Sequence, residues 1–154
     1  MSIPADIQDA MGEDWLPTIY ADEVRNLRTR SCSLDIPERE NRADIMHTLL
    51  GIELQIGRRR FSCPDLATAR YMQVFARVGC REFAIPYDIT KISTLADRLE
   101  TARQRSLLLL ESRGESQIGR LRPGLLREIR SQLAAIGPGE RMPQFNQSTK
   151  QRPS

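Results

Sequence analysis

The predicted fold is decided by residues 52–86, which read IELQIGRRRFSCPDLATARYMQVFARVGCREFAIP. Apolar and polar side chains alternate over 52–56, a Gly-Arg pair follows, and residues 59–63 form the expected returning strand. Alternation interrupted by a two-residue turn that starts with glycine is typical of a β-hairpin. Residues 64–78 then carry apolar side chains at helical spacing, and residues 82–86 form one more short apolar run. The stretch therefore predicts a hairpin, a helix and a strand, in that order.

The arrangement of these elements depends on how the last strand pairs. If 82–86 lies parallel to 59–63, the helix between them is a right-handed crossover. The hairpin and the last strand then make a small three-stranded mixed sheet with helices packed against it. We therefore expect the α+β class, with a single domain over residues 37–136.

Helices are expected on both sides of this sheet. Over 37–50, a proline in the first turn, nearby acidic residues and apolar residues three or four positions apart predict a helix that Gly51 ends. The longest helix is expected over 89–113. A last helix is expected over 123–136, after an irregular linker at 115–122.

The two ends of the chain differ from this middle in composition. Residues 1–24 hold six acidic residues and no Lys or Arg, so we expect an acidic N-terminal arm over 1–36. Because the formal net charge of the whole chain is +3, the residues after 24 carry +9. Residues 137–154 are rich in Gln, Pro, Asn and Ser and are expected to be disordered.

Composition excludes several classes of protein. Hydrophobic residues make up 40% of the chain, and no uninterrupted apolar run exceeds four residues, which is too short to cross a membrane. The first 24 residues have no basic region and no apolar stretch, so no secretory signal is expected and the cytoplasm is the expected compartment. The three cysteines, Cys32, Cys63 and Cys80, lack CxxC spacing, and no metal or cofactor is expected.

The basic residues are almost all arginines, since only Lys91 and Lys150 among the 23 are lysines. Two explanations are open. Guanidinium groups bind phosphate oxygens in pairs, so an arginine-rich surface is typical of contact with nucleic acid or another polyanion. A GC-rich genome produces the same bias without any function, because arginine then stands where lysine would serve.

Three groups of arginines are candidates for such a surface. The first is at the predicted hairpin turn, the second on the helix that follows, and the third near the last helix. Phe61, beside the first group, could stack on a base. If the three groups face one way, they form a continuous basic stripe. The candidate residues are Arg58, Arg59, Arg60, Arg70, Arg77, Arg120, Arg122, Arg127 and Arg130.

An enzyme is the weaker alternative. Cys63 precedes a predicted helix, whose N-terminus would stabilise a thiolate, and His47 is the single histidine that could serve as its base. On the helix expected over 37–50, His47 shares the polar face with Glu40 and Asp44, a set that could also ligate a metal. A cysteine before a proline commonly only caps a helix or packs, and a metal would need a third or fourth ligand from elsewhere, so we expect no enzymatic activity.

Self-association is predicted from the end of the longest helix. Four leucines follow one another there, and successive residues on a helix lie about 100° apart, so one core cannot cover them all. Leu108 falls on an otherwise polar side and is expected to contact either the last helix or a second copy of the chain. The residues expected at a homodimer interface are Leu107, Leu108 and Leu110.

Together these patterns predict a small non-enzymatic binding or regulatory protein with an arginine-rich face for nucleic acid or another polyanion. The alternative is a protein–protein adaptor or assembly factor, acting as a homodimer, in which the basic charge is only compositional. The two hypotheses differ in whether the arginine groups share one face of the molecule.

Overall fold

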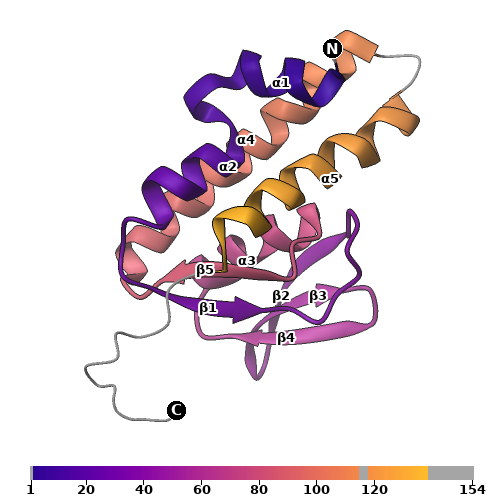
Figure 1. Cartoon of the computed structure of the whole chain (residues 1–154). Coiled ribbons are helices and arrows are strands. Elements are labelled where there is room, and N and C mark those ends of the chain that lie inside the picture. Colours follow the sequence, from indigo (N-terminus) through magenta and orange to yellow (C-terminus); the bar gives the residue numbers. More distant parts are fainter. Residues whose placement is uncertain (1, 115–117, 139–154) are drawn as a thin grey trace.

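The computed structural model describes residues 2–114 and 118–138 and has the α+β architecture that the sequence predicts (Figure 1). Helices α1, α2, α4 and α5 lie on one side, two small sheets lie on the other, and α3 lies between them. In chain order the elements are α1 (Ile3–Met11), η1 (Gly12–Asp14), α2 (Leu16–Ile19), η2 (Tyr20–Val24), β1 (Thr29–Ser33), β2 (Ala43–Thr48), β3 (Gly51–Ile56), β4 (Arg59–Cys63), α3 (Leu66–Val78), β5 (Glu82–Pro86), α4 (Ile89–Gly114) and α5 (Ile118–Ile136).

The strands of the described part of the chain pair only antiparallel. β2, β3 and β4 make a three-stranded sheet in that order, with Leu54 of the central strand opposite Ile45 and Phe61. β5 pairs with β1 in a separate two-stranded sheet. The parallel pairing expected between β4 and β5 therefore does not occur, and the third strand of the larger sheet is β2. The partner of β5 comes from the N-terminal part of the chain, which local patterns around the hairpin do not indicate.

The largest difference from the sequence-based expectation is that a strand replaces the helix over 37–50. β2 pairs along its whole length with β3, and its residues Ala43 and Ile45 face the core beside Leu54. The same residues also fit helical spacing, so the pairing with β3, and not the local pattern, selects the strand here. Gly51, expected to end a helix, is the first residue of β3, directly after the β2–β3 turn, and has a φ of 124°.

The helix after the hairpin is confirmed, with its first residue shifted. α3 begins at Leu66, because the Asp65 carboxylate accepts a hydrogen bond from the Thr68 amide (2.7 Å) and so caps the first turn. The strand that follows and the long helix after it also lie where the sequence predicts them. These elements are specified by local signals at their ends.

The last helix is longer than expected. α5 begins at Ile118, so the linker expected over 115–122 is helical from that residue onward, and Pro123 lies inside the helix. Residues 115–117 and 139–154 lie outside the described part, which includes most of the tail expected to be disordered. Among the described residues, no helix is long and apolar enough to cross a membrane.

One hydrophobic core joins the helices to the sheets, and aromatic rings occupy its centre. Phe75 of α3 stacks on Phe83 of β5 with ring centroids 4.3 Å apart, and Tyr20 of η2 contacts Phe75 edge-on. The Tyr71 hydroxyl donates to the Ala84 carbonyl (2.6 Å). These contacts fix α3 against β5, so the residues that connect the two elements have a defined position.

The acidic N-terminal segment packs on α4 and α5. Trp15 is fully buried, and its Nε1 donates to Oε1 of Gln132 in α5 (2.8 Å). Asp14 and Glu23 pair with Arg98 of α4 at 3.2 and 2.7 Å. Among the described residues, the ion pairs of the acids in 2–24 are made with Arg98 and Arg105, whereas Asp35, near the end of the arm expected over 1–36, pairs with the candidate Arg59. The domain boundary expected after the segment stays a prediction.

Candidate polyanion-binding surface

The two candidate arginines of α3 are held against neighbouring elements. Arg70 pairs with Asp97 of α4, and Nη1 of Arg77 lies 3.3 Å from a carboxylate oxygen of Glu100. Nη2 of Arg77 also donates to the Ala43 carbonyl (3.2 Å). These guanidinium groups join α3 to α4 and β2, and Arg77 shares the Glu100 carboxylate with Arg103, whose Nη2 lies 2.7 Å from it.

The four candidate arginines of α5 divide into two kinds. Arg122 makes a two-pronged contact with Glu40, with nitrogen–oxygen distances of 2.7 and 2.5 Å. Nη1 of Arg130 donates to the carbonyl of Val78 (2.9 Å), at the C-terminal end of α3, where a cation is favoured. The exposed arginines of α5 for which the described residues provide no ion pair are Arg120 and Arg127.

The β3–β4 turn presents its three arginines in different ways. Arg58 is exposed and makes no ion pair with any described residue. Nη1 of Arg59 lies 2.7 Å from Oδ2 of Asp35, whereas Nη1 of Arg60 lies 3.9 Å from Oε1 of Glu53. Because successive side chains of a strand point to opposite faces, Arg60 is directed away from Arg59.

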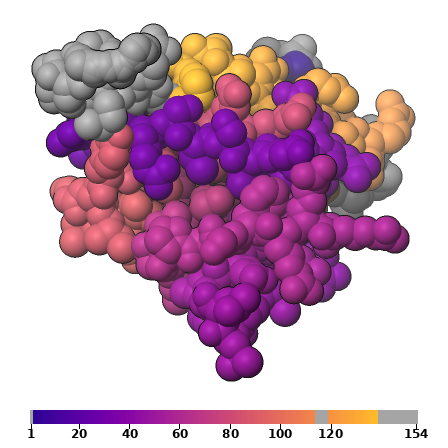
Figure 2. Space-filling view, turned by 90° about the horizontal axis from the view of Figure 1, so that it is seen from below, coloured from indigo at the N-terminus to yellow at the C-terminus, as the bar shows by residue number. Residues whose placement is uncertain are grey.

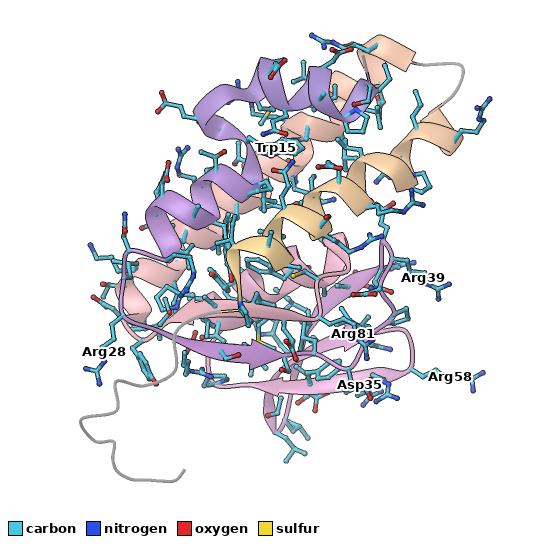
Figure 3. All side chains as sticks on the ribbon, in the orientation of Figure 1. Trp15, Arg28, Asp35, Arg39, Arg58 and Arg81 are labelled. Carbon is cyan, nitrogen blue, oxygen red and sulfur yellow. The ribbon has the colours of Figure 1, made fainter. Side chains whose placement is uncertain are left out.

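Four arginines from three segments come together at one end of the molecule. Asp35, in the β1–β2 connection, pairs with Arg59 and, at 3.7 Å, with Arg81. Figure 3 shows the side chains of Arg39, Arg58 and Arg81 at the same end as Asp35. We call Arg39, Arg58, Arg59 and Arg81 the arginine corner. Two of the four, Arg39 and Arg81, were not among the residues that the sequence indicated.

The backbone beneath the arginine corner is fixed by the end of α3. Gly79 ends that helix with a φ of 89°, and the Arg39 carbonyl oxygen lies where a Cβ of residue 79 would be. Nδ2 of Asn41 donates to the carbonyls of Arg39 (2.9 Å) and Ala76 (3.1 Å). The β1–β2 connection is therefore held on α3 by glycine packing and by a side-chain amide.

An open cavity of about 470 Å³ lies beside the arginine corner, and its lining is mixed in charge. Three carboxylates, from Asp35, Glu38 and Glu82, oppose the guanidinium groups of Arg81 and Arg130. This balance disfavours an anion inside the cavity, because each carboxylate repels it. A polyanion would therefore contact the arginine corner outside the cavity, where Arg39 and Arg58 are exposed.

The pair expected for nucleophilic catalysis is not assembled. Cys63 lies at the end of β4, and burial raises the pKa of its thiol, whose Sγ contacts the Phe61 carbonyl (3.6 Å) and Sδ of Met72 (4.0 Å). Ile52 of the central strand β3 pairs with His47 of β2 on one side and with Cys63 of β4 on the other. His47 and Cys63 are therefore separated by two inter-strand spacings of about 5 Å each. Cys63 is therefore a neutral packing residue without a base beside it.

The expected cluster of Glu40, Asp44 and His47 is also dispersed. Asp44 and His47 lie on β2 an odd number of residues apart and so face opposite sides of the sheet. Glu40 precedes the strand and pairs with Arg122. Within residues 2–114 and 118–138, no group of three or more His, Cys, Asp or Glu side chains is placed to hold a metal ion.

Two of the three leucines expected at a dimer interface lie in the core of a single chain. Leu107 and Leu110 are buried, while the side chain of Leu108 is 62% exposed. Beside it, Met11 and Leu109 line a shallow cavity of about 370 Å³. A homodimer through this surface stays a prediction, and Leu108 is the residue of the three that is accessible for it.

The structure thus separates the three arginine groups, so they do not form the continuous basic stripe that a shared face would have given. The α3 pair faces α4 and β2, and the α5 group contains both paired and exposed members. Of the hairpin group, Arg58 and Arg59 meet Arg39 and Arg81 at the arginine corner, whereas Arg60 points away from it. No family model, no curated protein and no solved structure matches this chain.

Proposed function

We propose that this protein is a non-enzymatic binding or regulatory protein that engages nucleic acid, or another polyanion, through the arginine corner. The observation that carries the proposal is that Arg59 and Arg81 share a single carboxylate, Asp35. Arg39 and Arg58 stand beside them, and the described residues provide no ion pair for either. The three free cysteines are in keeping with a reducing compartment, the cytoplasm.

Exchange of the shared carboxylate for a phosphate is energetically inexpensive. The side chains of Arg59 and Arg81 are 60% and 50% exposed, and Asp35 is 67% exposed. Surface ion pairs of this kind contribute only about 0–1 kcal/mol, because water and salt screen them. A phosphate can accept two parallel hydrogen bonds from one guanidinium group, so it competes well with Asp35 for both arginines.

The contact proposed is with the phosphate backbone and not with the bases. Phe61, the aromatic ring beside the hairpin turn, packs against the hydrophobic core and is only partly exposed. Because Phe61 is not free to stack on a base, sequence-independent attraction between arginine and phosphate supplies the binding energy. Affinity should therefore depend strongly on salt and weakly on base sequence.

Replacing Arg58, Arg59 and Arg81 together by glutamine should weaken the binding of a labelled single-stranded oligonucleotide by more than about tenfold at low salt. The slope of log affinity against log salt should fall by about two to three units, since each lost phosphate contact removes nearly one released counterion. Fluorescence anisotropy at several salt concentrations measures both quantities.

A control variant removes the same charge elsewhere. Lys91, Arg105 and Arg113 are exposed on α4, and their joint replacement by glutamine lowers the net charge equally. The control should keep most of the affinity and slope of the wild type. Equal losses in both variants, or no measurable binding by the wild type, would show that the arginine corner is not a polyanion site.

A second candidate function, a protein–protein adaptor, is favoured by a different observation. Leu49 and Leu50, at the β2–β3 turn, have side chains exposed to solvent almost completely. Exposed leucines side by side are typical of a surface that another protein covers. Affinity capture with and without nuclease treatment separates the two functions, because partners held only through nucleic acid are lost after treatment.

A further inference from the structure

The outer edge of β2 is open. This strand pairs with β3 on one side only. On the other side, the Ala43 carbonyl accepts hydrogen bonds from Nε2 of Gln73 (2.9 Å) and Nη2 of Arg77 (3.2 Å). Backbone groups of an edge strand point outward at every second residue, so those of Ile45 and His47 face the same side as Ala43. No described residue bonds to the outward groups of these two residues.

The chain beyond this edge is apolar and fixed in shape. Oγ1 of Thr48 accepts a hydrogen bond from the Leu50 amide (3.1 Å) and donates one to the Gly51 carbonyl (3.0 Å), which closes the β2–β3 turn. Leu49 and Leu50 have relative exposures of 106% and 93%, and Figure 2 shows the turn projecting from the surface. The turn therefore presents two leucines to solvent in one defined conformation.

From Ile45 onward, the open edge lacks the features that normally protect an edge strand, and the acid of β2, Asp44, is paired with Arg42 of the same chain. Proteins block such edges with charged side chains, prolines or bulges, because unpaired backbone groups attract another strand. Residues 45–50 contain no Asp, Glu, Lys, Arg or Pro. Met46, in the middle of the edge, is 42% exposed. An unprotected edge that ends in exposed leucines is suited to pairing with a further strand.

We propose that the partner is a second copy of this chain, paired antiparallel through β2 so that the two three-stranded sheets become one sheet of six strands. The two-fold axis passes beside Met46, and Ile45 of each copy lies opposite His47 of the other. Each of these two pairs exchanges two backbone hydrogen bonds, so the free outward groups of both copies are satisfied. A two-fold axis at Ile45 would instead place Ala43 of each copy opposite His47 of the other. That pairing needs the Ala43 carbonyl, which already accepts hydrogen bonds from Gln73 and Arg77.

The side chains are compatible with this register. Asp44 of one copy lies opposite Thr48 of the other, so no like charges meet, and Asp44 is already paired with Arg42 of its own chain (3.0 Å). The turn of each copy continues beyond the paired residues and lies beside Arg42 and Ala43 of the other copy. Leu49 is thereby shielded from solvent, which supplies apolar burial in addition to the hydrogen bonds.

A membrane surface fits the same turn less well. Insertion of exposed leucines into lipid is usually supported by basic residues close to them. The arginines of the hairpin lie at the β3–β4 turn, at the opposite end of β3 from Leu49 and Leu50. Hydrogen-bond pairing along β2, which a lipid surface cannot provide, distinguishes the two occupants.

The oligomeric state of the full-length protein tests the proposal. Light scattering during size-exclusion chromatography should give twice the chain mass of 17.6 kDa at micromolar concentration. His47→Pro removes an outward N–H from each copy, and proline is tolerated where the N–H of an edge strand faces solvent. Met46→Lys places like charges at the axis. Each variant should raise the dimer dissociation constant by more than about tenfold while circular dichroism stays unchanged.

A cross-link gives a second readout that does not depend on the tolerance of proline. Residues at position 46 of the two copies form a pair with Cα atoms about 4.5 Å apart, within the range that a disulfide spans. Met46→Cys should therefore form a covalent dimer under mild oxidation, whereas Leu108→Cys should not. A monomeric wild type would overturn the proposal. So would a wild-type dimer that dissociates in the Leu108→Asp variant but stays intact in the His47→Pro and Met46→Lys variants. Binding of vesicles by a monomeric wild type would do so in favour of a membrane surface.

Discussion

Replacing Trp15 by alanine should lower the free energy of unfolding by about 3–5 kcal/mol, the range measured for large aromatic side chains removed from a core. Trp15 is fully buried, and it connects the acidic N-terminal segment to α5 through its hydrogen bond to Gln132. The substitution leaves a cavity that the surrounding helices cannot fill and an amide of Gln132 with one partner fewer. Urea denaturation followed by circular dichroism measures the loss.

Trp15→Phe is the matched control for this prediction. Phenylalanine keeps most of the apolar volume but cannot donate to Gln132. The control should therefore lose clearly less stability than the alanine variant. A loss below about 1 kcal/mol for Trp15→Ala would mean that the N-terminal segment contributes little to the core.

Replacing Gly79 by alanine should be similarly damaging, and it should affect the arginine corner as well. Alanine at a positive φ costs about 1 kcal/mol or more. In addition, the new Cβ would lie within 2.7 Å of the backbone carbon and nitrogen of Arg39, which real structures do not allow. The β1–β2 connection must move away, so we expect a total loss of about 3 kcal/mol together with weaker polyanion binding.

Gly124 provides the comparison. It lies in α5 without a positive φ, and a Cβ there would meet no atom within 4 Å. Gly124→Ala should raise stability by about 0.5–1 kcal/mol, because alanine favours the helix. If Gly79→Ala behaved like Gly124→Ala in thermal unfolding, the close packing of the β1–β2 connection on α3 would be refuted.

The parts of the fold that the sequence predicts well are those specified by neighbouring residues. The β3–β4 hairpin follows from alternation around a glycine turn, and α3 follows from the Asp65 cap and the Gly79 stop. β2 fits two periods at once, and only its pairing with β3 selects the strand. β1 has no apolar alternation, and it becomes a strand because β5, about 50 residues later, pairs with it.

The sequence predicts only part of the arginine corner, because it shows local features of the chain but not contacts between distant residues. Exposure of Arg58 follows from its place in a turn, which the sequence shows. Whether an arginine is neutralised depends on acids that are distant in sequence, such as Glu40, 82 residues from Arg122. Arg81 gave no signal because a single exposed arginine after a helix stop is common, and its role depends on Asp35.

The most direct test of the proposed function locates the bound oligonucleotide on the protein. Isotope-labelled protein is titrated with a short single-stranded oligonucleotide, and the backbone amide shifts are followed by nuclear magnetic resonance. We predict that the shifts concentrate at residues 35–39, 57–60 and 79–82, which form the arginine corner and its support, and that added salt reverses them. Shifts centred on α4 or on the β2–β3 turn, or no shifts at low salt, would contradict the proposed function.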